Sequence, residues 1–431
     1  MKRRKICKLF LGAILIFGMV APGMAMAKEK VNVWIISTRT QAGDAKIGEQ
    51  VKAFCKMKNM AVDFSVVPTE QIQAKIAAAI EAGHPPDLVQ MLGHIVQYYA
   101  SQDLLVDVSD IVSEIKKKGG GIYESATLPL VTKDNRQWGV PVEVELWPMY
   151  MRKDLVERAG FSAPETWEEL RKIAKAAQDP SKRIYGFGIP LSKCGDATTH
   201  IRELIWAFGG KLIEADGKTV AVNSPETLAA VQFIADMYLK DKSIPPGATS
   251  WNDAGNNAIY QTGQAVFIQN PGSVYRWMLE NDNTLLENTE LIPWPAGPGG
   301  PSHTSEGGCI AWMAFKGANN VAFVKEMLRY LYEPDRYGEM VSAVNGRFFP
   351  IYKEVAQYPL FKSRFFKNYG KIAQDARIAG WPAPPSVPMS ECDSRYLLVD
   401  MVQRVILQGM PPQKSLDILE EEMNKIYAKY Q

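Results

Sequence analysis

The chain has 431 residues, of which 46% are hydrophobic, with 49 basic and 47 acidic side chains and a net charge of +2. This length and an ordinary apolar fraction predict two or three units, each burying a core of its own. The near balance of charge, without a basic stripe or an arginine cluster, argues against nucleic acid and against an anionic membrane surface as partners.

Residues 1–27 have the three parts of a secretory signal peptide. A basic start, Lys2 to Lys8, precedes the apolar segment Leu9 to Val20, and Ala25-Met26-Ala27 forms an A-x-A cleavage site. The apolar run is shorter than the ~20 residues of a membrane-spanning helix. We therefore expect cleavage after Ala27 and a soluble periplasmic protein, whose mature chain has 44 basic and 47 acidic residues, a net charge of −3.

Four cysteines follow the expected cleavage site, and their spacing is wide and irregular: Cys55, Cys194, Cys309 and Cys392. This spacing is not a disulfide framework and contains no zinc pattern. The sequence therefore favours buried free thiols, although an oxidising compartment leaves disulfide pairing open.

The mature chain begins with the strand–helix–strand alternation of a parallel α/β sheet. Val31 to Ser37, Ala61 to Val67 and Leu88 to Leu92 are the expected strands, and Thr69 is expected to cap the second intervening helix. Ligands of such sheets bind at the carboxyl ends of the strands. The candidate contacts there are Thr38, Arg39 and Gln90.

An extended run begins near Trp138, in which Val142 and Val144 alternate with Glu143, Glu145 and Trp147. Alternate residues of a strand share a face, so we expect the two valines in a core and the other three on the opposite face. Carboxylates beside a large ring suit a polar organic ligand. We interpret this face as a binding surface.

Four short segments in and after this run have a distinctive order and spacing: Gly139-Val140-Pro141, Lys153-Asp154-Leu155, Ala159-Gly160-Phe161 and Pro164 to Leu170. They resemble the maltose-type family of extracellular solute-binding proteins, the soluble receptors of ABC importers. Met151-Arg152 departs from the family, which has an aromatic residue followed by Asn before the Lys-Asp pair.

The resemblance implies a type II periplasmic binding protein fold, with two α/β lobes joined by a three-strand hinge and a ligand cleft between them. The implied N-terminal lobe is 28–144 plus 292–332, and the implied C-terminal lobe is 145–291 plus 333–431. The chain is expected to cross between the lobes near 143–146, 290–296 and 332–336.

The later segments supply the remaining site candidates. A strand over Gly263 to Gln269 leads into a loop with Asn270 and Ser273, near which the family often has a tryptophan that is missing here. Gly308, in a Pro- and Gly-rich stretch, lets a ligand approach the backbone, and Trp381 is a candidate second stacking platform. Glu145 matches a sugar-contacting glutamate position of the family, with Trp147 stacking beside it.

Catalysis is the weaker interpretation. Glu143 and Glu145 are ~6.5–7 Å apart along a strand, near the ~6.5–9.5 Å of inverting glycosidases, but neighbours on one strand approach a sugar from the same side. The sequence has no zinc-protease pair, Walker loop or nucleophile elbow. We therefore expect no enzyme, no cofactor and no metal.

The leading hypothesis is a monomeric receptor that binds a sugar or oligosaccharide and delivers it to a membrane ABC permease. One alternative keeps the fold and changes the ligand to a polyol phosphate, an opine or another polar solute, because Arg39 and Arg152 could bind an anionic ligand. The others are a secreted carbohydrate-active enzyme and an interaction protein with a dead cleft.

Overall fold

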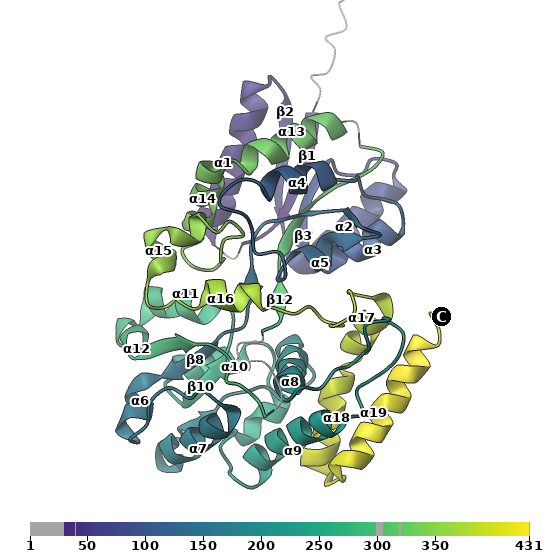
Figure 1. The fold of residues 1–431 in the computed structure, drawn as a ribbon. Helices are drawn as coiled ribbons and strands as arrows, with labels where there is room; N and C mark the ends of the chain where they lie inside the picture. Colours follow the sequence, from purple (N-terminus) through teal and green to yellow (C-terminus); the bar gives the residue numbers. More distant parts are fainter. Residues whose placement is uncertain (1–29, 39, 299–304, 319, 431) are drawn as a thin grey trace, which may run out of the picture.

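Two separate β-sheets, each covered by helices, organise the computed structural model (Figure 1). The structure describes residues 30–38, 40–298, 305–318 and 320–430. The predicted signal peptide and Arg39 lie outside the described residues. The sheets belong to two lobes, and the α/β fold of the type II periplasmic binding proteins is confirmed.

The first sheet has the strand order β2-β1-β3-β13-β6. Its strands are β1 (Lys30–Ile36), β2 (Ala61–Val67), β3 (Leu88–Leu92), β13 (Ile310–Ala314) and β6 (Val140–Pro141). The first three are parallel, as the sequence predicts, and β13 runs antiparallel to both β3 and β6. A strand from late in the chain therefore completes the sheet that the N-terminal residues begin.

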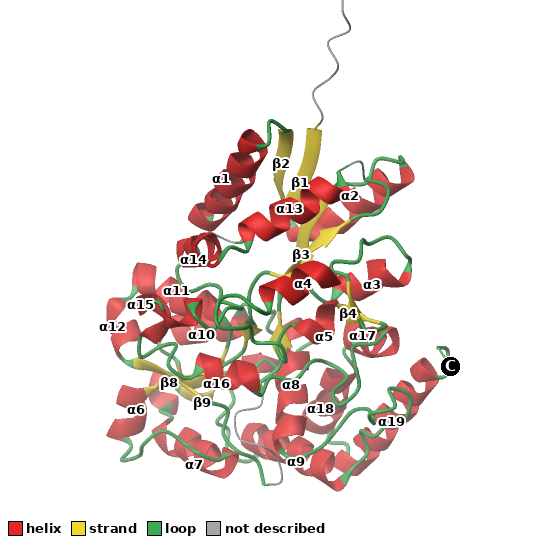
Figure 2. Ribbon diagram, turned by 45° about the horizontal axis from the view of Figure 1, so that its top comes forward, coloured by secondary structure: helices red, strands yellow, loops and turns green. Residues whose placement is uncertain are grey.

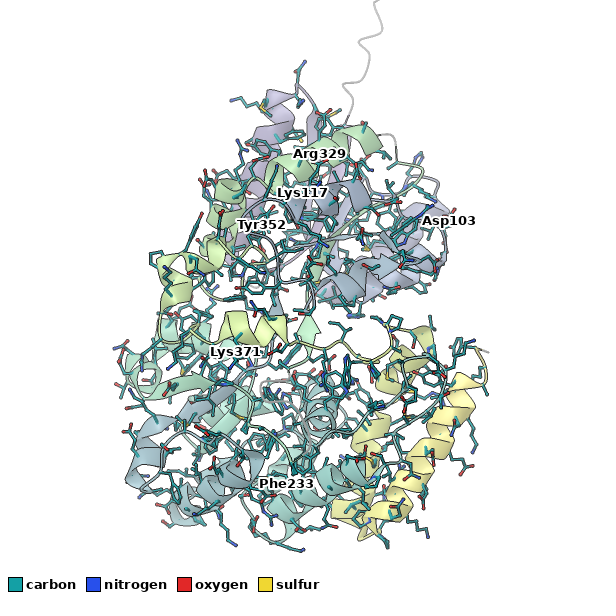
Figure 3. All side chains as sticks on the ribbon, in the orientation of Figure 1. Asp103, Lys117, Phe233, Arg329, Tyr352 and Lys371 are labelled. Carbon is teal, nitrogen blue, oxygen red and sulfur yellow. The ribbon has the colours of Figure 1, made fainter. Side chains whose placement is uncertain are left out.

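Helices cover both faces of this sheet, and Figure 2 shows α1 and α2 on opposite sides of β1 and β2. The covering helices are α1 (Gln41–Met57), α2 (Thr69–Glu81), α3 (Ile95–Ser101), α4 (Ser109–Ile115), α5 (Leu128–Val131), α13 (Val321–Leu331) and α14 (Pro334–Ala343). Arg329 of α13 joins α4 through ion pairs of 2.9 Å with Asp110 and Glu114 (Figure 3). A short hairpin of β4 (Thr132–Lys133) and β5 (Arg136–Gln137) lies beside α5.

The second sheet has the order β11-β8-β10-β9. Its strands are β8 (Met149–Arg152), β9 (Tyr185–Phe187), β10 (Ala265–Gln269) and β11 (Thr289–Ile292). Phe267 of β10 pairs with Met151 on one side and Phe187 on the other, and all three side chains are buried. All five residues of β10 are buried, which explains why Ala265 to Ile268 form a continuous apolar run.

The helices of the second lobe are more numerous, and α18 and α19 form its outer edge beside the C-terminus (Figure 1). They are α6 (Lys153–Arg158), α7 (Trp167–Ala177), α8 (Gly195–Ala207), α9 (Pro225–Leu239), α10 (Gly255–Gln261), α11 (Gly272–Asn281), α12 (Asn283–Glu287), α17 (Val387–Ser394), α18 (Leu397–Gln408) and α19 (Pro412–Tyr427). Phe233 of α9 is buried inside this lobe (Figure 3).

Helix capping is confirmed at one predicted position and wrong at another. Thr166 accepts a hydrogen bond from the backbone N–H of Glu169, whose carboxylate accepts from the Thr166 N–H, so the predicted capping box starts α7. Thr69, by contrast, is the first residue of α2 and Pro68 occupies the N-cap. Pro68 has an extended ψ of 137°, so the helical conformation begins only at Thr69, and no side chain caps this end of α2.

Two segments of the crossing region lie side by side at the waist of the molecule (Figure 1). The first leads from β6 to β8 and contains β7 (Glu145–Leu146); the second leads from β11 to β13 and contains β12 (Gly307–Gly308). β7 and β12 pair antiparallel, with Gly308 opposite Glu145. The expected first crossing, near 143–146, is thus part of this two-stranded link.

We propose that the third crossing lies after the expected position at 332–336. After those residues α14 packs against α1, and Gln50 of α1 donates a 2.8 Å hydrogen bond to the Arg336 carbonyl. Tyr337 of α14 is fully buried and donates to the carbonyl of Val142. In the lobe division that we propose, the N-terminal lobe therefore extends through Ala343, and the chain changes lobe after it.

The segment that follows α14 joins the lobes through aromatic side chains. Phe349 contacts Tyr123 of the first lobe at a ring distance of 5.6 Å, and Phe366 contacts Tyr275 of the second at 4.9 Å. Two short helices, α15 (Pro359–Lys362) and α16 (Tyr369–Gln374), lie in this segment. Aromatic contacts therefore connect this segment to both lobes.

All four cysteines after the expected cleavage site are buried free thiols. Burial raises the pKa of Cys55 and Cys194 to about 11 and that of Cys392 to about 12. Such thiols carry little thiolate at neutral pH and are unreactive. Within the described ranges, no helix has both the length and the apolar character needed to cross a membrane.

Candidate ligand-binding cleft

A cavity of about 230 Å³ opens between the lobes, and both lobes and the crossing segments contribute to its wall. The first lobe contributes the ends of β1 and β3 and the start of α2. The second contributes the starts of α8 and α11 and one face of α10. Because the parallel strands of the first sheet point their carboxyl ends at it, the cavity lies where this fold class binds ligands.

The structure brings five of the ten predicted site residues together around this cavity: Thr38, Glu145, Trp147, Asn270 and Ser273. Arg39 lies outside the described residues. The remaining four, Gln90, Glu143, Gly308 and Trp381, are described but do not line the cavity. Their roles in ligand contact stay predictions without support from the geometry.

Glu145 lies on the cavity wall and pairs with Arg347. One guanidinium nitrogen of Arg347 is 3.2 Å from Oε1 of Glu145, and the two side chains are only 13% and 18% exposed. Burial by itself lowers the pKa of Arg347, but the carboxylates of Glu145 and Glu143 raise it above its ordinary value. Arg347 was not among the predicted residues, because 202 positions separate it from Glu145.

Glu143 is buried and does not reach the cavity, which corrects the predicted alternation. Its Oε1 accepts a 3.1 Å hydrogen bond from the backbone N–H of Ile310 at the start of β13. The alternation fails because β6 ends at Pro141 and β7 begins only at Glu145, so Val142, Glu143 and Val144 are all buried. Burial, with the neighbouring Glu145, raises the pKa of Glu143 well above its ordinary value.

Gly308 makes room for side chains rather than for a ligand. A Cβ built at this position would lie 3.3 Å from Cβ of Glu145 and 3.6 Å from the edge of the Trp147 ring. The absence of a side chain at Gly308 therefore lets both predicted contact residues approach the β12 backbone.

Gln90 and Trp381 are packed away from the cavity. Gln90 is in β3, fully buried between β1 and β13, and its side-chain amide has no hydrogen-bond partner among the described residues. Trp381 is half-buried, with the Arg377 guanidinium 3.4 Å from its ring centroid and Trp206 against its edge. A side chain that already covers the ring occupies the position a second sugar would need.

Three polar side chains form a closed hydrogen-bond ring at one end of the cavity. Ser273 donates to Oδ1 of Asn270 at 2.6 Å, Asn270 donates to Asn257, and Asn257 donates to the Ser273 hydroxyl at 3.3 Å. Asn270 is in the loop after β10, Ser273 is in the first turn of α11 and Asn257 is in α10. Because the three orient one another, their remaining donors and acceptors are preorganised toward a ligand.

Two acidic residues that the sequence does not single out meet at the cavity wall, Asp196 in the first turn of α8 and Asp253 in the loop before α10. Asp253 accepts a 2.9 Å hydrogen bond from the backbone N–H of Asp196, and Asp196 accepts one of 3.1 Å from Asn256. Burial, and then the charge of Asp253, raises the pKa of Asp196 to about 7. The two are 57 positions apart, so no local signal in the sequence pairs them.

The raised pKa of Asp196 predicts a pH-dependent contribution to stability. The folded carboxyl holds its proton more tightly than the unfolded one, so stability falls as pH rises from about 4 toward 7. We expect Asp196→Asn to lose less stability than the native protein between pH 4.5 and 7.5, measured by urea unfolding. Parallel pH profiles of the two proteins would contradict this assignment.

The cavity offers hydrogen-bond acceptors, hydrogen-bond donors and an aromatic ring. Within the described residues, no group of three His, Cys, Asp or Glu side chains is placed to hold a metal ion. The Glu143 carboxylate, needed for a glycosidase-like pair, is bonded to the β13 backbone. The wall is therefore suited to holding a polar molecule.

Comparison with known proteins identifies the family. Residues 37–336 match the bacterial extracellular solute-binding proteins, which is well over half of the chain. The chain belongs to this family. A Brucella abortus (strain 2308) relative named only as a binding protein is 24% identical over 357 residues, covering 81% of this chain and 84% of its own. The family consists of binding proteins of transporters.

Solved structures of the same fold include sugar complexes from other bacteria. Maltose-bound MalE3 of T. maritima is 22% identical with a TM-score of 0.74, covering 92% of this chain and 99% of that one. A ribitol-bound solute-binding protein of Agrobacterium radiobacter K84 is 20% identical with the same TM-score, covering 92% and 98%. At this identity the likeness shows that the fold is shared.

Proposed function

We propose that this protein is the periplasmic receptor of an ABC importer, exported by a signal peptide cleaved after Ala27 and active as a monomer. It binds a neutral polyhydroxylated solute of about one sugar ring between its lobes and presents it to the permease. The observation that carries the proposal is a cavity walled by both lobes, with the Trp147 indole beside Glu145 and the Asn257–Asn270–Ser273 ring.

The side chains of the cavity wall suit both the apolar C–H faces and the hydroxyl groups of a sugar. The axial C–H groups of a sugar stack on an aromatic face, and its hydroxyls hydrogen-bond to carboxylates, amides and hydroxyls. Hydrogen bonds to charged groups contribute about 1.5–3 kcal/mol each. A few such bonds and one stacked ring reach the ~8 kcal/mol of a micromolar complex, after the entropic cost of association is subtracted.

The dimensions of the cavity favour one ring over an oligosaccharide. Its volume of about 230 Å³ is below the roughly 300–1,000 Å³ of pockets that bury drug-sized ligands. Trp147 and Phe348 are its aromatic lining residues in the described part of the chain. The Trp381 ring, which a longer ligand could have used, is covered by Arg377.

The charges that line the cavity favour a neutral ligand over an anion. Three carboxylates line the described wall, those of Glu145, Asp196 and Asp253, against the single guanidinium of Arg347, which is paired with Glu145. Of the two arginines that left an anionic ligand possible, Arg39 lies outside the described residues, and Arg152 binds Asp154 through two hydrogen bonds of 2.6 and 2.8 Å. A phosphate or sugar acid would meet unfavourable charge here.

A ligand screen by calorimetry and denaturant unfolding tests the proposal. We expect a pentose, hexose or pentitol to bind and to raise the free energy of unfolding by ~2.7 kcal/mol at a hundredfold excess over its dissociation constant. The matched disaccharides are expected to bind no more tightly, and X-ray scattering to show compaction as the lobes close.

Three outcomes would contradict parts of this proposal. A broad library without any stabilising compound would refute the receptor function. Affinity that rises tenfold on adding a second ring would refute the size assignment, and preference for a sugar phosphate over its parent sugar would refute the charge assignment.

A further inference from the structure

Glu203 of α8 is the centre of a buried hydrogen-bond network behind the Trp147 side chain. Its own side chain is fully buried. Oε1 accepts from the Ser305 hydroxyl at 3.1 Å and from the backbone N–H of Glu306, and Oε2 accepts from the amide nitrogen of Gln269. Three donors from two other segments of the chain therefore converge on one carboxylate.

The same donors hold the peptide groups of Trp147. The Trp147 N–H donates to the Ser305 hydroxyl oxygen at 3.2 Å, and the Gln269 amide nitrogen donates to the Trp147 carbonyl at 3.1 Å. Trp294 donates a second hydrogen bond, of 2.8 Å, to that carbonyl. Each polar backbone group of Trp147 is thus connected to Glu203 through one side chain, the N–H through Ser305 and the carbonyl through Gln269.

The network also fastens the crossing segment that carries β12 to the second lobe. Arg202, the residue before Glu203, places a guanidinium nitrogen 2.5 Å from the Glu306 carboxylate. Glu306 is therefore held by α8 at its N–H and at its side chain, immediately before Gly307 and Gly308 pair with β7. Trp147 and the strand beneath its ring are anchored to the same helix.

We infer that Glu203 is a positioning residue for ligand binding, setting through Gln269 and Ser305 the orientation in which Trp147 presents its ring to the cavity. The expected change in ligand affinity rests on the proposed function, whereas the expected change in the orientation of the Trp147 ring does not. An ionised carboxylate can accept from all three donors and has no donor of its own. Burial raises the pKa of Glu203 well above its ordinary value, and these three hydrogen bonds oppose that rise.

Glu203→Gln is the sharpest substitution because it changes one oxygen to a donor at nearly constant shape. If the new NH₂ faces Gln269, that amide must rotate to accept from it, and its nitrogen then leaves the Trp147 carbonyl. If the new NH₂ faces Ser305 and Glu306, it meets the N–H of Glu306, which has lost its acceptor. Either arrangement disturbs the segment that holds Trp147.

The experiment labels the tryptophans with 5-fluorotryptophan and follows the ¹⁹F resonance that disappears in Trp147→Phe. We expect this resonance to shift in Glu203→Gln without any ligand present. His200→Leu is the matched control, since His200 is on the same helix, is equally buried and bonds to none of the network. If Glu203→Gln does not fold, Ser305→Ala replaces it in the experiment, because it removes the hydroxyl between Glu203 and the Trp147 N–H with a smaller structural change.

The affinity for the best-binding monosaccharide completes the test. We expect Glu203→Gln to weaken binding about tenfold, His200→Leu to leave it unchanged, and the Glu203→Gln/Trp147→Ala double variant to bind as Trp147→Ala does. An unmoved Trp147 resonance, or strictly additive losses of affinity, would overturn the inference. A native protein that binds no sugar would refute the proposed function, while the resonance would still report on Glu203.

Discussion

Trp147→Ala is expected to weaken the binding of a neutral monosaccharide at least tenfold while leaving the protein folded. The indole is half-buried and lines the cavity. A stacked aromatic ring removes a large apolar area from water when a ligand covers it. Losing that contact corresponds to ~1.4 kcal/mol or more of binding free energy, measured by titration calorimetry.

Trp138→Ala is the matched control for this prediction. Trp138 is also a half-buried tryptophan, but its N–H donates a 3.0 Å hydrogen bond to the Lys133 carbonyl and its ring faces Lys316, away from the cavity. We expect this variant to lose some stability and no affinity. Equal affinity losses in the two variants, or unchanged affinity in Trp147→Ala, would remove Trp147 from the site.

Arg347→Met is expected to cause the largest loss of stability, about 3–5 kcal/mol at neutral pH, because it leaves a buried acidic partner without its cation. Arg347 and Glu145 form a 3.2 Å pair that is mostly buried, and Glu143 lies close enough for its charge to raise the pKa of Arg347. Methionine keeps much of the volume, so a cavity contributes little. Urea unfolding of the purified variant measures the effect.

The loss should depend on pH in a direction that the raised pKa of Glu143 determines. In the folded protein Glu143 holds its proton to higher pH than in the unfolded chain, so its contribution falls as pH rises above about 4.5. Removing Arg347, which lowers the pKa of Glu143, strengthens this effect. The stability difference between native protein and Arg347→Met should therefore be larger at pH 8 than at pH 5.

A surface arginine gives the control. Arg364 is 40% exposed and pairs at 3.2 Å with Glu287, which is 65% exposed. Arg364→Met is expected to cost about 0–1 kcal/mol with little dependence on pH, because water screens exposed pairs. If Arg347→Met behaves like Arg364→Met, the Glu145–Arg347 pair does not organise the cavity wall.

The fold and five residues of the cavity wall could be predicted from the sequence because the relevant signals are local. Alternating strands and helices indicated the parallel sheet. Thr166 and Glu169, three residues apart, indicated where α7 begins. The rule that ligands bind at carboxyl ends of strands placed Thr38 at the cavity. The family resemblance at Glu145 and the loop after β10 indicated the opposite side.

The tertiary structure decided the rest, since burial and pairing depend on segments that are distant in the chain. Glu145 alternates with valines in the sequence, but only packing brings Arg347 against it. Glu143 has the same pattern of neighbours, and the end of β6 at Pro141 buries it instead. Trp381 has the composition of a stacking platform, and Arg377 covers it. Local periodicity determines which face of an element a side chain shares, whereas contacts across the fold determine what that face meets.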